Sequence, residues 1–308
     1  MKYYIGVTDY DWFSFLSQRE NEDINFWQPG GHLRFKAITQ GAPFLFKLKY
    51  PHNAIAGVGF FSSHTFLPLD VAWNIFGERN GIASFFQFKQ KIINYRRASN
   101  PFDKNPNIGC IILTDPIFFS REDWIEVPAN WSRNIVQGKS YDTISSFGKS
   151  LWNKVEMMLH KYQLFKRPES QKSQLVFNEP EGEYTRKYLT KVRLGQGAFR
   201  VQLTDAYHRR CSVSGEKTLP VLEAAHIKPF SESGPNHLSN GILLRADMHK
   251  LYDSGYITFT QDYQVEVSRK NQRRIRKWQR ILLISRKGTN RVTRSNGSQT
   301  RPKLHRMA

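Results

Sequence analysis

The chain has 308 residues and is 39% hydrophobic, which is enough for two globular domains, each with its own core. No apolar run reaches the roughly 18 residues of a membrane-spanning helix, and the first residues do not form a signal peptide. We therefore expect a soluble, cytoplasmic protein with no membrane partner. The formal net charge is +20, which favours a polyanion such as nucleic acid as the partner.

Residues 1–165 are rich in aromatic side chains, with 18 of the 22 Phe and six of the seven Trp. Helical spacing of apolar residues predicts helices over 83–97 and 144–164. Short apolar runs between Gly, Pro and Asn predict strands at 3–7, 44–48, 55–61 and 108–114. This mixture predicts an α+β domain.

The rest of the chain divides into three parts by composition. Residues 166–185 are polar, carry two Pro and show no period, so they are predicted to be a linker. A second domain is expected over 186–268. Residues 269–308 contain 14 Lys and Arg and no Asp or Glu. They are expected to be a DNA-holding basic tail, a solvated end, or a terminus altered by a change of reading frame.

The segment VLEAAHIKPFSESGPNHLSNGILLRADMHKLYDSGYITF carries the candidate chemistry. VLEAAHI predicts a strand that ends at His226, a loop of turn formers follows, and a short helix is predicted to stop at Gly255. On that helix His249 and Asp253 are four residues apart, so they share one face and can bind one divalent ion. An imidazole that activates water and a metal that neutralises phosphate charge are what phosphodiester hydrolysis needs.

With AAHIKP, NGILL and the later His and LYD, this segment resembles the HNH (ββα-metal) endonuclease family over roughly residues 196–268. The resemblance implies a ββα-metal fold and a divalent ion such as Mg²⁺ or Mn²⁺. It makes His226 the general base, while Asn240 would hold the loop and orient the His226 imidazole. It makes His249 and Asp253 the metal ligands.

One position departs from the family pattern. Ala225 stands where the family often has a further ligand, directly before the general base. Either the ion keeps two protein ligands, or Glu223, on the same strand face, supplies a third. Cys110 and Cys211 lie far apart without a CxxC partner, so no structural zinc is expected, and Cys211 is predicted to be a small core residue.

The first domain more loosely resembles the PUA-like/EVE superfamily, small β-barrel-type domains that accept a base turned out of the duplex. Fusions of such a domain to an HNH nuclease resemble restriction enzymes that cut DNA bearing 5-methylcytosine or 5-hydroxymethylcytosine. Reading a flipped base requires aromatic stacking and a few polar groups. The candidate base-binding residues are Trp27 and Trp73, with Phe61 in reserve, and the polar residues Ser62, Ser63 and Asn74.

Taken together, these patterns predict a modification-dependent DNA endonuclease that acts in defence against foreign DNA. Double-strand cleavage by a single HNH site implies a homodimer or two successive nicks. Two alternatives stay open: an HNH nuclease of unmodified DNA, of homing or toxin type, and a modified-base or RNA reader whose nuclease half is inactive.

Overall fold

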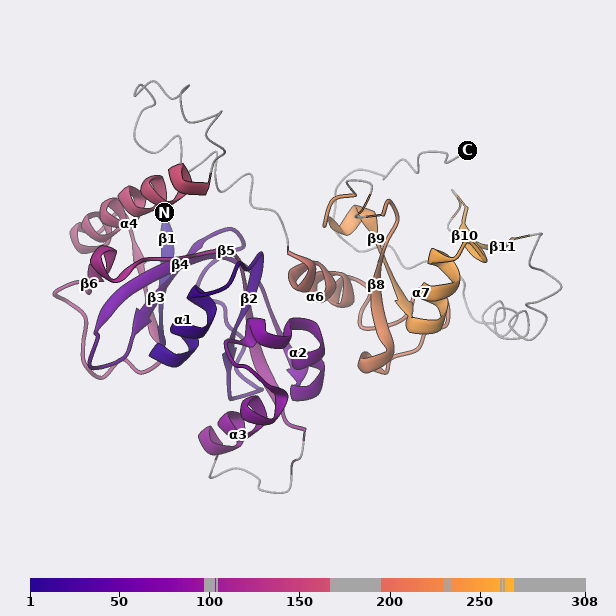
Figure 1. Ribbon diagram of the computed structural model, residues 1–308, viewed down its shortest axis with the longest axis horizontal. Coiled ribbons are helices and arrows are strands. Elements are labelled where there is room, and N and C mark those ends of the chain that lie inside the picture. The colour runs from indigo at the N-terminus through magenta and orange to yellow at the C-terminus, as the bar shows by residue number, and fades with distance from the viewer. Residues whose placement is uncertain are drawn as a thin grey trace. The chain divides into compact units, whose positions relative to one another are not determined.

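The structure is a computed structural model that describes residues 1–96, 103, 105–166, 195–229, 231, 234–260, 262 and 264–268. The chain divides into two compact units, Met1–Ala198 and Phe199–Ala308 (Figure 1). Both units contain helices and strands, which confirms the predicted α+β class. The predicted tail, 269–308, and the predicted linker beyond Lys166 lie outside the described residues. None of the described helices is long and apolar enough to cross a membrane.

The first unit is built on a mixed sheet, which has seven strands in the described part of the chain. Their order is β2-β5-β4-β3-β1-β7, with β6 paired to β4. Only β1 and β3 run parallel among these pairs; their register ends at Thr8 opposite Leu48. The strands are β1 (Lys2–Thr8), β2 (Asp23–Gln28), β3 (Pro43–Leu48), β4 (Ala54–Pro68), β5 (Asn107–Phe118), β6 (Ile125–Glu126) and β7 (Gly138–Asp142).

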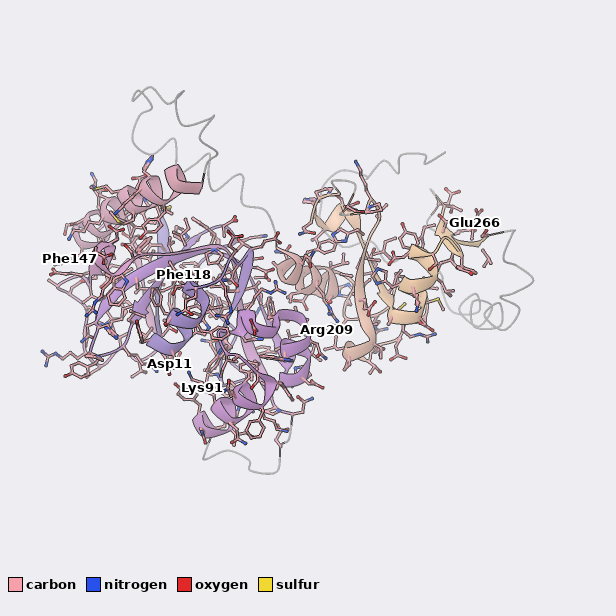
Figure 2. The ribbon with its side chains drawn as sticks, viewed as in Figure 1. Asp11, Lys91, Phe118, Phe147, Arg209 and Glu266 are labelled. Atoms are coloured by element: carbon pink, nitrogen blue, oxygen red, sulfur yellow. The ribbon has the colours of Figure 1, made fainter. Side chains whose placement is uncertain are left out.

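All four predicted strand runs lie inside observed strands, namely β1, β3, β4 and β5. Both predicted helices are also present, as α3 and α4, whereas α1, β2 and β7 were not predicted. Phe147, at the start of α4, is 46% exposed, so the apolar stripe of this helix begins later than its sequence suggests (Figure 2). The helices are α1 (Tyr10–Ser17), α2 (Leu69–Phe76), α3 (Phe85–Tyr95) and α4 (Ser146–Lys166), with single turns η1 (Gly77–Asn80) and η2 (Arg121–Asp123).

Strand β3 lies at the centre of the unit, and all six of its residues are buried. Because side chains alternate along a strand, Phe44 and Phe46 enter one hydrophobic core and Leu45 enters another. The core around Leu45 includes Val155 and other residues of α4, and the core around Phe44 includes Trp12 and other residues of α1. The sheet is therefore covered on both faces, which explains why PFLFKL is an almost continuous apolar run.

The second unit contains a two-stranded ribbon followed by a helix. Its core gathers Phe199, Leu203, Leu243 and Met248, and Cys211 is buried with them, as predicted. The run ITFTQDYQVEVS contains the antiparallel strands β10 and β11. The elements are α6 (Gln196–Ala206), η4 (Leu219–Val221), β8 (Leu222–His226), η6 (Leu238–Asn240), β9 (Gly241–Arg245), α7 (Ala246–Asp253), β10 (Ile257–Phe259) and β11 (Val265–Val267).

Because β3 is buried on both faces, truncating one of its side chains should destabilise the first unit. Phe44→Ala removes a fully buried ring and should lower the free energy of unfolding by about 3–5 kcal/mol. Phe86→Ala, at a side chain that is 70% exposed, is the matched control and should change it by less than about 0.5 kcal/mol. Urea unfolding of both variants measures their free energies of unfolding. Equal effects of the two substitutions would contradict the burial of Phe44 on β3.

Candidate active site

His226 is the last residue of β8 and pairs with Gly241 at the start of β9. Its imidazole stacks on the buried ring of Phe199, with centroids 4.5 Å apart and planes inclined by 19°. A side chain at Gly241 would bring its Cβ within 2.8 Å of both Phe199 and Leu203. Glycine at 241 therefore lets α6 approach the strand closely enough for Phe199 to hold the imidazole.

A hydrogen bond further orients the His226 ring. Its Nε2 lies 2.8 Å from Oδ1 of Asn236 in the loop between β8 and β9. Because an amide oxygen only accepts hydrogen bonds, this contact places a proton on Nε2, so Nδ1 would be the basic nitrogen whenever the imidazole is neutral. This tautomer is suited to a general base that acts through Nδ1.

Asn240 closes the same loop from the other end. Its Oδ1 accepts from the Lys228 backbone N–H at 2.8 Å, and its Nδ2 donates to the carbonyls of Lys228 at 3.1 Å and Pro235 at 3.0 Å. The amide is buried and serves the backbone of the loop. The structure therefore separates the two tasks expected of Asn240: it holds the loop itself, whereas Asn236 contacts the imidazole.

His249 lies on α7 between two carboxylates. Its Nδ1 is 2.7 Å from Oε2 of Glu223 on β8, and its Nε2 is 3.2 Å from Oδ2 of Asp253, one helical turn later. Glu223 shares a strand face with Ala225, whose side chain is fully buried, so this is the face that meets α7. The neighbouring Arg200 donates to the Leu222 carbonyl at 2.9 Å; burial lowers the pKa of its guanidinium, while the charge of Glu223 opposes this change.

The donor set fits a divalent ion at one place. If Nδ1 donates its proton to Glu223, the Nε2 lone pair faces the Asp253 carboxylate 3.2 Å away, and these two acceptors are placed to share a divalent cation. A carboxylate that accepts from the far nitrogen of a ligating imidazole is the usual support of a metal-binding histidine. The residues suited to hold the ion are thus His249, through Nε2, and Asp253.

Glu223 does not complete a three-ligand set in this geometry, since one imidazole cannot give both nitrogens to the same ion. Among the residues that the structure describes, no group of three or more His, Cys, Asp or Glu side chains is arranged to hold a metal. Glu223 instead orients His249. Solvent exposure agrees with Asp253 as the ligand and Glu223 as the orienting residue. The Asp253 side chain is 61% exposed and that of Glu223 is 42% exposed, so Asp253 has more room for water and phosphate oxygens.

The first unit contains a cavity of about 280 Å³, at the lower end of the range for ligand pockets. Trp27 lines it, and the indole is fixed by a 2.9 Å hydrogen bond from Nε1 to the Asn80 carbonyl. The ring of Tyr95, with its centroid 6.0 Å from that of Trp27, adds a second aromatic wall. Asp9 and Lys49 also line the cavity.

The structure places the other five predicted base-binding residues outside this lining. Trp73 packs beside Phe85 and Phe88 in the α2–α3 region. The remaining four have different surroundings: Phe61 and Ser62 are buried on β4, Ser63 is half-buried beside them, and Asn74 is exposed on α2. Trp27 is thus the predicted aromatic residue that the cavity contains.

A family model matches part of the second unit. Residues 211–260 match the family model HNH_2, described as HNH endonuclease. The segment is HNH-like. This HNH segment includes β8, β9 and α7, with His226, Asn240, His249 and Asp253, and the match confirms the resemblance read from the sequence.

Solved structures resemble the other half of the chain. The ASCH protein from Zymomonas mobilis has 11% sequence identity and a TM-score of 0.35, and the match covers 49% of this chain and 94% of that one. A variant of the same protein gives 11% identity and a TM-score of 0.35 over 50% of this chain and 99% of its own. No curated protein sequence matches the chain.

Sequence reasoning missed three residues that shape these sites: Phe199, Asn236 and Tyr95. Phe199 belongs to a helix without a clear apolar period, and Asn236 is one of many polar residues in a turn-rich loop. Tyr95 lies within the helix predicted over 83–97, and half of its surface is exposed. Only tertiary contacts distinguish these residues from ordinary loop and core positions.

The two carboxylates beside His249 should differ in their effect on metal use. Asp253→Ala removes a ligand and should raise the Mg²⁺ or Mn²⁺ concentration for half-maximal cleavage more than Glu223→Gln, which should raise it roughly 10-fold or more. Glu266→Gln, at an exposed residue of β11 labelled in Figure 2, is the charge-matched control and should leave the titration unchanged. An unchanged titration for Asp253→Ala would place the ion elsewhere.

Proposed function

We propose that this protein is a metal-dependent DNA endonuclease that cleaves DNA containing modified cytosine, 5-methylcytosine or 5-hydroxymethylcytosine. The HNH segment supplies the hydrolysis, and the cavity around Trp27 holds the modified base. We further propose that the enzyme acts in the cytoplasm against foreign DNA. Cleavage of both strands then requires two copies of the chain or two successive nicks.

His226 carries the proton-transfer step in this proposal. Nδ1 takes a proton from the attacking water while Phe199 and Asn236 hold the ring in place. Asn240 keeps the loop closed around that ring, so little reorganisation of the base is needed during the reaction. The resulting hydroxide attacks phosphorus, and the 3′ oxygen leaves.

The charge that develops on the phosphate must be neutralised at the same time. A divalent ion bound by His249 and Asp253 would polarise the phosphate and stabilise the leaving oxygen. Glu223 keeps His249 oriented for that task, and the exposure of Asp253 gives the substrate access. Because Ala225 offers no ligand, His249 and Asp253 would be the two protein ligands of the ion, and water and phosphate oxygens would complete its coordination.

Base capture explains the cavity in the first unit. A base that is turned out of the duplex loses its stacking partners, and an aromatic side chain can replace them. Trp27 is suited to this role because its indole is held by Asn80 and lines a cavity of about 280 Å³, which is large enough for one base. The 5-methyl group adds apolar surface against the aromatic wall.

The single observation that carries the proposal is that one chain contains both an HNH segment and a separate aromatic cavity of this size. An HNH nuclease of unmodified DNA would have no need of the cavity. A reader with an inactive nuclease half would have no need of the contacts that hold the His226 imidazole or of the two carboxylates beside His249. The combination therefore favours a nuclease that is guided by a base.

Substitution of His226 tests the chemical half. His226→Ala should reduce the cleavage rate by at least 100-fold, the usual size of a general-base contribution, and leave DNA affinity near that of the wild type. Single-turnover cleavage and metal-free binding assays measure the two effects. His208→Ala, outside the site, is the control; retention of most of the rate by His226→Ala would remove His226 from the mechanism.

Substrate choice tests the reading half. Plasmid DNA carrying 5-methylcytosine should be cleaved in Mg²⁺ or Mn²⁺, and unmodified plasmid should be cleaved much more slowly. Trp27→Ala should lose about 1–3 kcal/mol of binding on modified DNA and little on unmodified DNA, because only the flipped base stacks. Trp73→Ala is the matched control, with no loss specific to modified DNA. Equal cleavage of both plasmids would contradict modification dependence.

A further inference from the structure

Asp9 occupies an unusual position at the start of α1. It is the N-cap residue, and an Asp there normally accepts a hydrogen bond from the first turn of its own helix. The Asp9 side chain makes no such bond to the backbone of α1, all of which the structure describes. Asp9 is instead one of the residues that line the aromatic cavity, as are Lys49 and Tyr95.

The sheet topology brings a cation beside this carboxylate. Strands β1 and β3 are parallel neighbours that end in register at Thr8 and Leu48, so the next residues of both, Asp9 and Lys49, lie side by side. Lys49 Nζ donates to Asp9 Oδ1 at 2.6 Å. The carboxyl ends of parallel strands are also where α/β proteins commonly bind ligands.

Helix α3 holds the second oxygen. Tyr95 donates its hydroxyl to Asp9 Oδ2 at 2.9 Å, and Lys91, one turn earlier on the same helix face, places Nζ 3.4 Å from that oxygen. Figure 2 labels Lys91 on this helix. Burial would raise the pKa of Asp9, but the bonds from Lys49 and Tyr95 and the charges of Lys49 and Lys91 outweigh it and lower the pKa.

The chemical consequence is a fixed acceptor in a wall of the cavity. An ionised carboxylate offers about four lone-pair sites and donates nothing, so the bonds from Lys49, Lys91 and Tyr95 leave room for a further donor. A carboxylate is the side chain that accepts from the amino group of cytosine. Thymine has an oxygen at the corresponding position, which an anionic acceptor repels.

We propose that Asp9 selects the base in this cavity by accepting a hydrogen bond from its exocyclic amino group, so that an amino-bearing base such as cytosine is bound and thymine is rejected. This inference rests on the proposed function, because it assumes that the cavity around Trp27 holds a base. It names the edge of the base that is read, whereas Trp27 contributes stacking that any base would receive.

The test compares two bases that share the ring methyl group. Full-length protein is titrated without divalent metal against short duplexes that carry either 5-methylcytosine or thymine opposite an abasic site, so that unpairing costs are alike. The wild type should bind the 5-methylcytosine duplex roughly 10-fold or more tightly, as expected for one hydrogen bond to a charged group. Asp9→Asn, whose amide can also donate to a carbonyl, should bring this ratio close to one or below it.

Three further variants make the result specific. Asp9→Ser keeps a good N-cap residue, so it removes the carboxylate without weakening the helix and should lose the preference as Asp9→Asn does. Asp11→Asn removes a charge from the exposed side of the same helix, labelled in Figure 2, and should keep the preference. Trp27→Ala should weaken binding of both duplexes and keep their ratio.

The outcomes separate this inference from the proposed function. If Asp9→Asn and Asp9→Ser melt like the wild type and keep the full preference, selection by Asp9 is overturned. Selection by Asp9 is also overturned if the wild type binds the 5-methylcytosine and thymine duplexes equally. If Trp27→Ala still weakens binding in that case, base capture by the cavity stands. If neither Trp27→Ala nor the Asp9 variants change binding of either duplex, the cavity holds no base and both ideas fail.

Discussion

The burial of strand β3 on both faces is the constraint on which the first unit depends. A strand with no solvent-facing side must place every side chain in a core, and β3 does so with Phe44, Leu45 and Phe46 on alternate faces. Its parallel neighbour β1 must then end in register with it. The cavity wall containing Asp9 and Lys49 follows from this pairing, because both residues leave the sheet at the same edge.

The HNH segment depends on a different kind of constraint. Its chemical groups lie on a short ribbon and one helix, which by themselves cannot hold an imidazole rigidly. Each histidine therefore has supporting contacts: Phe199 and Asn236 hold His226, and Glu223 orients His249. Small active sites on short elements need such supporting contacts, since a shift of about 1 Å can cost a large part of the rate.

Much of the fold was predictable because strong local signals coincide with buried elements. The apolar runs of β1, β3, β4 and β5 and the stripe of α4 report burial directly, so the sequence suffices to place them. Strand β2, with the sequence DINFWQ, mixes polar and apolar residues because its Asp23 and Asn25 are buried with partners. That pairing is invisible without the tertiary structure.

The candidate catalytic residues could be proposed from the sequence, because their residue types and their spacing match those of the HNH pattern. The residues that hold them in place could not be proposed in this way. Glu223 was weighed as a third metal ligand, and only the distances to the two nitrogens of His249 assign it an orienting role. At the cavity, the sequence favoured Ser62, Ser63 and Asn74 because they stand near aromatic residues. Asp9 is remote in sequence from Trp27 and joins it only through the sheet.

The orientation of the Trp27 indole depends on a residue that does not line the cavity. The indole is fixed by the backbone carbonyl of Asn80, a residue of the turn η1, and the Asn80 side chain in turn bonds to Asn25 and to the Gly77 carbonyl. Substitutions in that turn would tilt the Trp27 indole without altering any residue that lines the cavity. Drift in a short turn thus offers a route by which the shape of the cavity changes while its lining residues stay the same.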